Sequence, residues 1–195
     1  NALVTIDSTN DLVKAGIGQH TVNTQFKTFS LFDFSPTAGT HHTLTTNIGA
    51  SEGTAYTGDA NGSDWGGTGT DPASSLTLAS AAAQFVPCVW LLQGNITIDE
   101  VSYIMSADGA TTANLHVEEY SIVSGSGSTA GDLTSEATLA HSNSVITIGD
   151  DRASNGTLTL STADVDSGKA IVVFAENIGG TDDITVQVNI KYHLR

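Results

Sequence analysis

The chain has 195 residues, and 39% of them are hydrophobic, which is enough for the core of one all-β domain with an extension. Its 21 acidic residues against six basic ones give a formal net charge of -15. Such a surface repels phosphate backbones and anionic lipids, so we expect no nucleic acid and no membrane among its partners.

Residues 1–48 are predicted to form an N-terminal extended arm with short strands. The clearest of these covers Thr21–Phe34, which reads as one or two strands. Ser8 is a suitable cap for a short helix over residues 8–15, which Gly16 would end. Four of the six phenylalanines gather in the last apolar cluster and need a surface that covers them. We therefore predict that they bind a neighbouring molecule: Phe26, Phe29, Phe32 and Phe34.

Residues 49–75 are predicted to form a Gly/Ser/Thr-rich loop between the arm and the main domain. Tyr56 and Trp65 are the aromatic residues in this stretch. An isolated Trp in such a loop usually packs against the protein or binds a ligand, which indicates order around Trp65. Tyr56 and Trp65 are therefore a second set of candidate binding residues.

Residues 76–195 contain short apolar segments at the intervals of a β-sandwich domain. The clearest segment is 183–193, where apolar and polar residues alternate strictly. Residues 170–175 are apolar throughout, which predicts a central strand that is buried on both faces. In all we predict about eight antiparallel strands, over residues 83–92, 95–105, 113–123, 136–140, 144–148, 156–160, 169–176 and 183–193.

Two of these strands change the parity of their apolar residues part-way. The changes fall at Asp99-Glu100 and at Glu118-Glu119. One extra residue in a β-bulge produces such a change, so we predict a bulge at each acidic pair. We interpret the carboxylates as solvent-facing residues on the outside of a bend, with a metal site as the alternative.

Several acidic clusters leave calcium open as a ligand. Residues 66–71 match the start of a calcium-binding nonapeptide, but that motif needs several stacked copies. Residues 59–64 resemble the opening of an EF-hand loop without its Gly and its bidentate Glu. Pairs of Asp at 150–151, 164 and 166, and 182–183 offer oxygen ligands at loop ends, or they are simply carboxylates on solvated turns. No cofactor is required, and no metal-binding residue is assigned.

The histidines and the single cysteine give weaker signals. His41 and His42 point in opposite directions if they lie in a strand, whereas His116 and Glu118 share one strand face. That placement alone does not predict zinc. Cys88 lies in an apolar run and is predicted to be a buried structural thiol, and a lone cysteine forms no internal disulfide.

Several common catalytic motifs are absent from the sequence, which contains no H-E-x-x-H, Walker or C-x-x-C pattern. Glycosidase chemistry would need two carboxyl groups in an aromatic-lined cleft, and the chain has only two Trp and four Tyr. We therefore predict that the protein is not an enzyme and assign no catalytic residue.

Four segments carry a pattern that covers residues 84–195. They are an apolar-Pro strand start at Phe85–Trp90, the strand Ile96–Met105, an Asp-x-x-x-Gly-x-x-Ile entry at Asp164–Ile171, and a closing alternating strand at Val186–Tyr192. This pattern resembles small jelly-roll structural proteins of tailed bacteriophage virions, of the head-decoration (cement) or fibre type. Lys169 departs from the acidic residue expected after the Gly.

The resemblance implies a jelly-roll-like sandwich on the surface of the extracellular particle. It implies a capsid decoration protein that binds and stabilises the head lattice as a homotrimer, with the major capsid protein or other virion proteins as partners. A tail-fibre or spike subunit, or a receptor- or carbohydrate-binding module, is the alternative. In that alternative Tyr56 and Trp65 would supply the contact surface.

Overall fold

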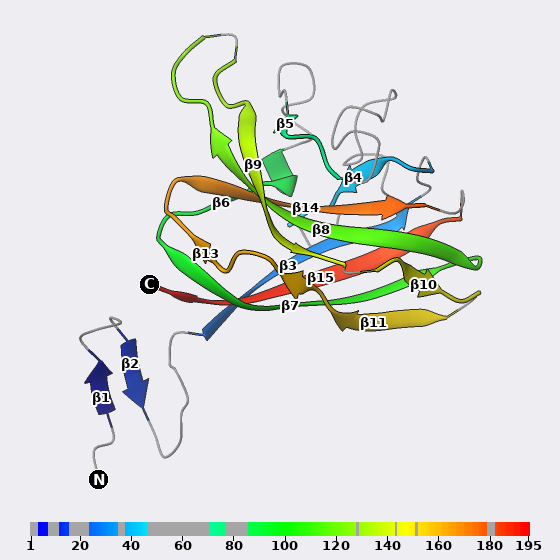
Figure 1. Cartoon of the computed structure of the whole chain (residues 1–195), viewed down its shortest axis with the longest axis horizontal. Helices are drawn as coiled ribbons and strands as arrows, with labels where there is room; N and C mark the ends of the chain where they lie inside the picture. Colours follow the sequence, from blue (N-terminus) through cyan, green and yellow to red (C-terminus); the bar gives the residue numbers. More distant parts are fainter. Residues whose placement is uncertain are drawn as a thin grey trace.

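The computed structural model describes residues 4–7, 12–15, 24–34, 38–46, 71–76, 86–127, 129–142, 144–150, 152–178 and 182–195 (Figure 1). Within these ranges the regular structure is almost entirely β, with one 3-10 turn, η2 (Val86–Cys88). No described helix is long and apolar enough to cross a membrane. β1 (Val4–Asp7) pairs with β2 (Leu12–Ala15) in a separate two-stranded sheet, and the other described strands form an antiparallel sandwich.

One layer of the sandwich is a sheet of five described strands, called here the five-stranded sheet. Four of them have the order β11-β7-β15-β3, and β13 pairs with β7. Their bounds are β3 (Thr24–Phe34), β7 (Ile96–Ala107), β11 (Ala153–Thr157), β13 (Asp164–Val165) and β15 (Ile184–Leu194).

The second layer, the eight-stranded sheet, contains eight described strands. Five have the order β12-β9-β8-β14-β4, while β10 pairs with β8, β5 with β9 and β6 with β14. Their bounds are β4 (His41–Thr43), β5 (Ser75–Leu76), β6 (Trp90–Leu91), β8 (Thr111–Ile122), β9 (Leu133–His141), β10 (Ile146–Ile148), β12 (Thr159–Leu160) and β14 (Lys169–Asn177).

The main core lies between the two sheets. β15 shows how it forms, because Ile184, Val186, Val188 and Ile190 are buried there while the intervening polar residues are exposed or half-buried. The alternation predicted from the sequence is thereby confirmed. Leu115 and Val117 of β8 and Ile171 and Val173 of β14 meet this row from the opposite sheet.

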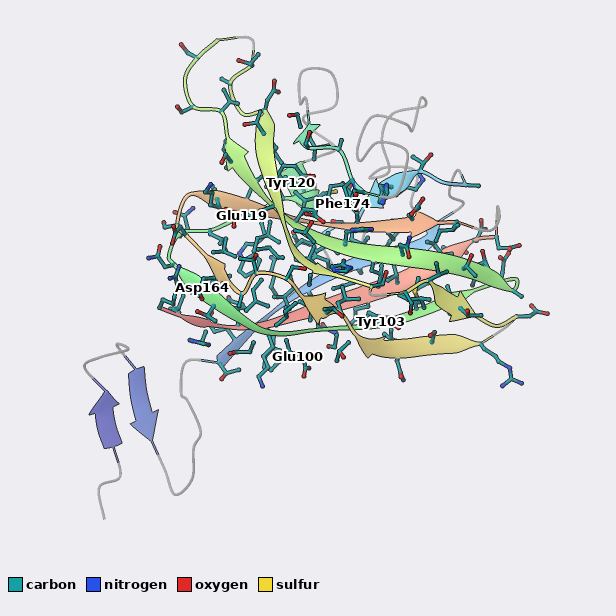
Figure 2. All side chains as sticks on the ribbon, in the orientation of Figure 1. Glu100, Tyr103, Glu119, Tyr120, Asp164 and Phe174 are labelled. Carbon is teal, nitrogen blue, oxygen red and sulfur yellow. The ribbon has the colours of Figure 1, made fainter. Side chains whose placement is uncertain are left out.

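A second apolar cluster lies on the outer side of the eight-stranded sheet. It joins Tyr120 of β8 to Ala170, Val172 and Phe174 of β14, with Leu76 and Leu133 beside them. The rings of Tyr120 and Phe174 lie 6.4 Å apart (Figure 2). β8 and β14 are therefore buried on both faces, as the apolar run 170–175 predicts for β14.

The two predicted bulges have different outcomes. The register between β15 and β7 shifts where Lys191 faces Glu100 and Tyr192 faces Ile98, so Asp99 is the extra residue and the bulge is confirmed. β8 pairs with β14 without any shift, and its irregularities lie in the pairing with β9. The parity change in β8 has another cause, since its apolar residues supply two cores on opposite faces.

One side of the sandwich is closed by the chain that follows β4. Leu44 N donates to Val173 O at 2.8 Å in the eight-stranded sheet. One residue later, Thr45 N donates to Ser30 O at 2.9 Å, and Ser30 N donates back to Thr45 O at 2.8 Å, in the five-stranded sheet. This crossing joins the two sheets through backbone hydrogen bonds.

Three predictions about local structure need correction. Residues 24–34 and 41–43 belong to the sandwich and not to an arm, because β3 pairs with β15 and β4 pairs with β14. Residues 12–15 form strand β2 and not a helix. Among the described residues of the predicted strand 83–92, Val86–Cys88 is a 3-10 turn and Trp90–Leu91 is a strand. The predicted strands of residues 95–148 and 169–193 occur with shifted ends, whereas the predicted strand 156–160 is divided between β11 and β12, which lie in different sheets.

Candidate functional site

The outer side of the five-stranded sheet differs from that of its partner, because its side chains are exposed or half-buried. We call it the open face. Neighbouring strands contribute to it through residues that share one parity and face one another in register. Its residues include Phe26, Thr28, Ser30 and Phe32 of β3, Gln187, Asn189 and Lys191 of β15, Ser102 and Ile104 of β7, and Asn155 of β11.

Two aromatic side chains of the edge strand β3 stand out on the open face. Phe26 is 67% exposed and Phe32 is 59% exposed, which is unusual for residues that mostly lie inside proteins. Ile104 of β7 adds a third apolar side chain at 47%. These apolar side chains are accessible to another molecule that covers the open face.

The polar residues between these aromatic groups are held in place by hydrogen bonds. Thr28 Oγ1 donates to Asn189 Oδ1 at 2.8 Å, and Gln187 Nε2 donates to the same oxygen at 3.3 Å. Lys191 stands opposite Phe26 in the β15–β3 register and opposite Glu100 in the β15–β7 register. The open face therefore offers fixed amides and hydroxyls beside its aromatic rings.

A bulge in β3 lies next to Phe32. The pairing of β3 with β15 shifts between Ile184 and Val186, and Asp33 has a φ of 47°. Asp adopts this left-handed conformation more readily than most residues. Asp33 N donates to Thr185 Oγ1 at 3.0 Å, which fixes the backbone directly after Phe32.

The six candidate binding residues have different positions. Phe26 and Phe32 lie on the open face, whereas Phe29 is fully buried in the main core and takes no part in the surface. Phe34 pairs with Ile184 at the end of β3, and its side chain lies outside the described part of the chain. Tyr56 and Trp65 also fall outside the described residues.

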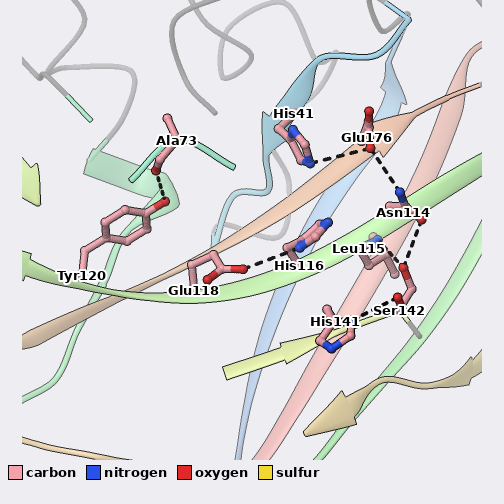
Figure 3. A network of polar contacts seen from close by, with 10 residues as sticks. All are labelled: His41, Ala73, Asn114, Leu115, His116, Glu118, Tyr120, His141, Ser142 and Glu176. Carbon is pink, nitrogen blue, oxygen red and sulfur yellow. Dashed lines mark hydrogen bonds and ion pairs between the residues drawn. The ribbon is translucent and has the colours of Figure 1, made fainter. Parts of the chain in front are cut away.

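A buried polar network occupies the eight-stranded sheet (Figure 3). His41 Nε2 lies 3.7 Å from Glu176 Oε2, and His116 Nδ1 lies 3.6 Å from Glu118 Oε1. The two imidazole rings meet edge to face, with centroids 5.1 Å apart. Sequence reasoning missed the pairing of His41 with Glu176, since β4 and β14 bring together residues that are far apart in the chain.

The interpretation of Glu118 as a solvent-facing residue is wrong. Its side chain is fully buried on the outer side of the eight-stranded sheet, beside His116. Glu119 is half-buried and lies 3.4 Å from Lys169 Nζ, while Asp99 and Glu100 are exposed as predicted. The error follows from the assumption that only one face of β8 is covered.

No group of three or more His, Cys, Asp or Glu in the described ranges is arranged to hold a metal ion. Two of the acidic residues considered for calcium are instead paired with a cation, because Arg195 lies 3.5 Å from Asp164 and 2.8 Å from Asp166. The segment 59–64 and all of 66–71 except Asp71 lie outside the described residues.

Cys88 is buried, as predicted, beside Thr43 of β4. Burial raises the pKa of its thiol from 9.0 to about 11, and a hydrogen bond with Thr43 acts in the opposite direction. The thiol therefore stays protonated at neutral pH and is a poor nucleophile.

A scan against protein-family models gives no match, and a search among curated proteins gives no significant match.

Proposed function

We propose that the chain is a decoration protein of a tailed-bacteriophage head, a jelly-roll-like module on the particle surface that binds the major capsid protein and stabilises the lattice. The observation that carries the proposal is the difference between the two outer sheet faces. One is covered by its own apolar cluster, and the other exposes Phe26 and Phe32 on an ordered strand. The resemblance of residues 84–195 to virion proteins supplies the class of partner.

The energetics of the open face suit binding to a protein lattice. Burying one large apolar side chain contributes about 1.5–3 kcal/mol, so Phe26 and Phe32 together supply a useful part of a binding energy. Aromatic side chains in the centre of an interface commonly dominate its affinity. The net charge of -15 opposes non-specific aggregation of the free protein, which suits a protein that accumulates before it binds a particle.

Homotrimer formation is part of the proposal and follows from the same resemblance. Three linked copies would present three open faces to neighbouring capsid subunits. Binding of the first copy then raises the effective concentration of the other two, so a modest affinity for each face becomes tight attachment. Light scattering of the purified chain tests this part directly.

The test is an add-back experiment with capsids assembled without this protein. Wild type and a Phe26→Ser/Phe32→Ser double variant are incubated with the particles, and bound protein is measured by co-sedimentation. Leu91→Ser is the matched control, because Leu91 of β6 is 47% exposed but belongs to the eight-stranded sheet. We expect wild type and Leu91→Ser to bind and the double variant to lose most of its binding.

Two results would overturn the proposal. One is binding of the double variant at the wild-type level while circular dichroism shows the same fold. The other is a copy number in intact virions far below that of the capsid subunits, which would indicate a fibre or spike subunit instead.

A further inference from the structure

We propose that a surface hollow, lined by strands of both sheets, binds a single neutral sugar unit. The hollow lies where β10 of the eight-stranded sheet approaches β11 of the five-stranded sheet, at the opposite edge of that sheet from Phe26 and Phe32, and it has a volume of about 230 Å³. Its lining comes from β7, the β9–β10 connection, β10, β11 and β12. The lining residues are Tyr103, Ser142, Ser144, Val145, Ile146, Thr147, Ser154, Thr157, Leu158 and Thr159.

The ring of Tyr103 is held in a fixed position. It packs against the main core, and it stands opposite Gly156 of β11 in the sheet register. A Cβ at Gly156 would lie 3.0 Å from Tyr103 Oη and 3.2 Å from two ring carbons, so the ring occupies the space that a side chain at position 156 would take. Tyr103, which is labelled in Figure 2, therefore needs little ordering when a ligand binds.

The hydroxyl groups of the lining are available to a ligand. Ser142 is the exception, because its Oγ donates to Asn114 Oδ1 and accepts from Leu115 N. The other five serine and threonine residues of the lining make no side-chain hydrogen bond within the described part of the chain. They are Ser144, Thr147, Ser154, Thr157 and Thr159.

The chemistry of this lining selects the class of ligand. None of the lining residues carries a charge at neutral pH, although the chain as a whole is strongly acidic. A carboxylate or phosphate would lack a cationic partner here, and a cation would lack a carboxylate. Hydroxyl groups beside Tyr103 and exposed Val145 suit a ligand with hydroxyls on its edge and C–H groups on its face, which describes a neutral pyranose.

The size of the hollow limits the ligand to one ring. Pockets for drug-sized ligands measure about 300–1,000 Å³, and this one is smaller. We expect a weak dissociation constant, on the order of 1 mM, for a free monosaccharide. Many copies on one particle would convert this weak binding into firm attachment to a glycan-covered surface.

The experiment is a titration of the ¹⁵N-labelled intact chain, followed by amide chemical shifts. The probes are glucose, galactose, mannose and N-acetylglucosamine, with anionic N-acetylneuraminic acid and glycerol as comparisons. We expect at least one neutral sugar to give saturable shifts that centre on residues 142–147 and 154–159. Neither comparison compound should saturate.

Three variants assign the site. Tyr103→Ala should weaken binding at least tenfold, and Ser154→Ala/Thr157→Val, which removes two hydroxyls from the rim, should weaken it severalfold. Ile104→Ala is the control, because the adjacent side chain lies on the open face. If Tyr103→Ala fails to fold, the rim double variant decides the question.

The proposal fails if no neutral sugar gives saturable shifts, if the shifts map elsewhere, or if the rim double variant binds like wild type. None of these results bears on attachment to capsids, because the capsid assay uses Phe26 and Phe32. Loss of capsid binding would likewise leave the sugar titration unchanged, so the two failures can be told apart.

Discussion

The two sheets of the sandwich share one core but differ on their outer faces. On the eight-stranded sheet, Tyr120, Val172 and Phe174 are fully buried in a second cluster, and a His–Glu network lies beside them. On the five-stranded sheet, Phe26 and Phe32 are exposed. The comparison shows which surface is used inside the molecule and which remains for a partner.

The same difference appears in the order of apolar and polar residues along the strands. β15 has one covered face and alternates strictly between apolar and polar residues. β14 has two covered faces, so Ala170–Ala175 is apolar at every position. The pattern of a strand therefore reports how many of its faces are covered.

The largest expected effect separates the two faces by stability. Phe174→Ala should cost about 3–5 kcal/mol of unfolding free energy, because it leaves a cavity in a closed cluster. Phe32→Ala on the open face should change the same quantity by at most about 0.5 kcal/mol. Urea unfolding followed by circular dichroism measures both. Similar losses in the two variants would mean that the open face is also part of a packed core.

The second prediction concerns two His–carboxylate pairs. His116→Ala should cost about 3 kcal/mol, because it removes the polar side chain that lies 3.6 Å from the fully buried Glu118 carboxyl group. His193 and Asp99 are only 2.9 Å apart, but both are partly exposed, so His193→Ala should cost at most about 1 kcal/mol. Chemical denaturation at pH 7 compares them. A larger loss at the shorter, exposed pair would contradict the assignment of the network to a closed environment.

The third prediction uses the titration of Cys88 to report its burial. The folded thiol has a pKa of about 11, above the ordinary value of 9.0, so the unfolded chain loses this proton first as the pH rises. The contribution of the buried Cys88 thiol to the unfolding free energy is complete below pH 9 and is lost towards pH 11. The unfolding free energy should fall by an amount on the order of 2 kcal/mol over this range.

Cys88→Ala isolates this contribution, because lysines and tyrosines titrate in both proteins over the same range. The measurement is the unfolding free energy of wild type and variant at several pH values between 8 and about 11. We expect the difference between the two curves to shrink as the pH rises. Parallel curves would show that the thiol is as accessible to water in the folded chain as in the unfolded one.

The sequence predicted the sandwich well where a strand has one covered face. It also held the information that separates Phe29 from Phe26 and Phe32, since a period of two places Phe29 on the opposite side of β3. The prediction that all of these phenylalanines form one binding cluster is therefore wrong for Phe29, which is fully buried. Assigning residues 24–34 to an arm hid the alternation.

The remaining features depend on contacts between distant residues. The burial of Glu118 has no local signal in the sequence, because the cover over β8 comes from other segments. In one of them, Ala73 O accepts a hydrogen bond from Tyr120 Oη at 2.8 Å. The hollow is likewise assembled from several strands of both sheets. No local pattern in the sequence encodes these contacts, since they follow from the order of strands in the sheets.

The smallest expected effect on stability is also the sharpest test of the open face. Asn189 accepts hydrogen bonds from Thr28 and Gln187 at a half-exposed position, where water can replace both partners. Asn189→Ala should therefore change the unfolding free energy by about 0.5 kcal/mol or less. Because its amide stands beside β3 on the surface proposed to contact the capsid, the same variant should weaken attachment in the add-back assay.

Asn155→Ala supplies the matched control for that effect. Asn155 is exposed on the same face, but it lies on β11, the strand at the opposite edge of the sheet from β3. If the contact centres on Phe26 and Phe32, Asn155→Ala should bind capsids more tightly than Asn189→Ala, although both variants are equally stable. Equal losses would mean that the contact extends across the whole sheet, and no loss in either would place it on the edge of β3 alone.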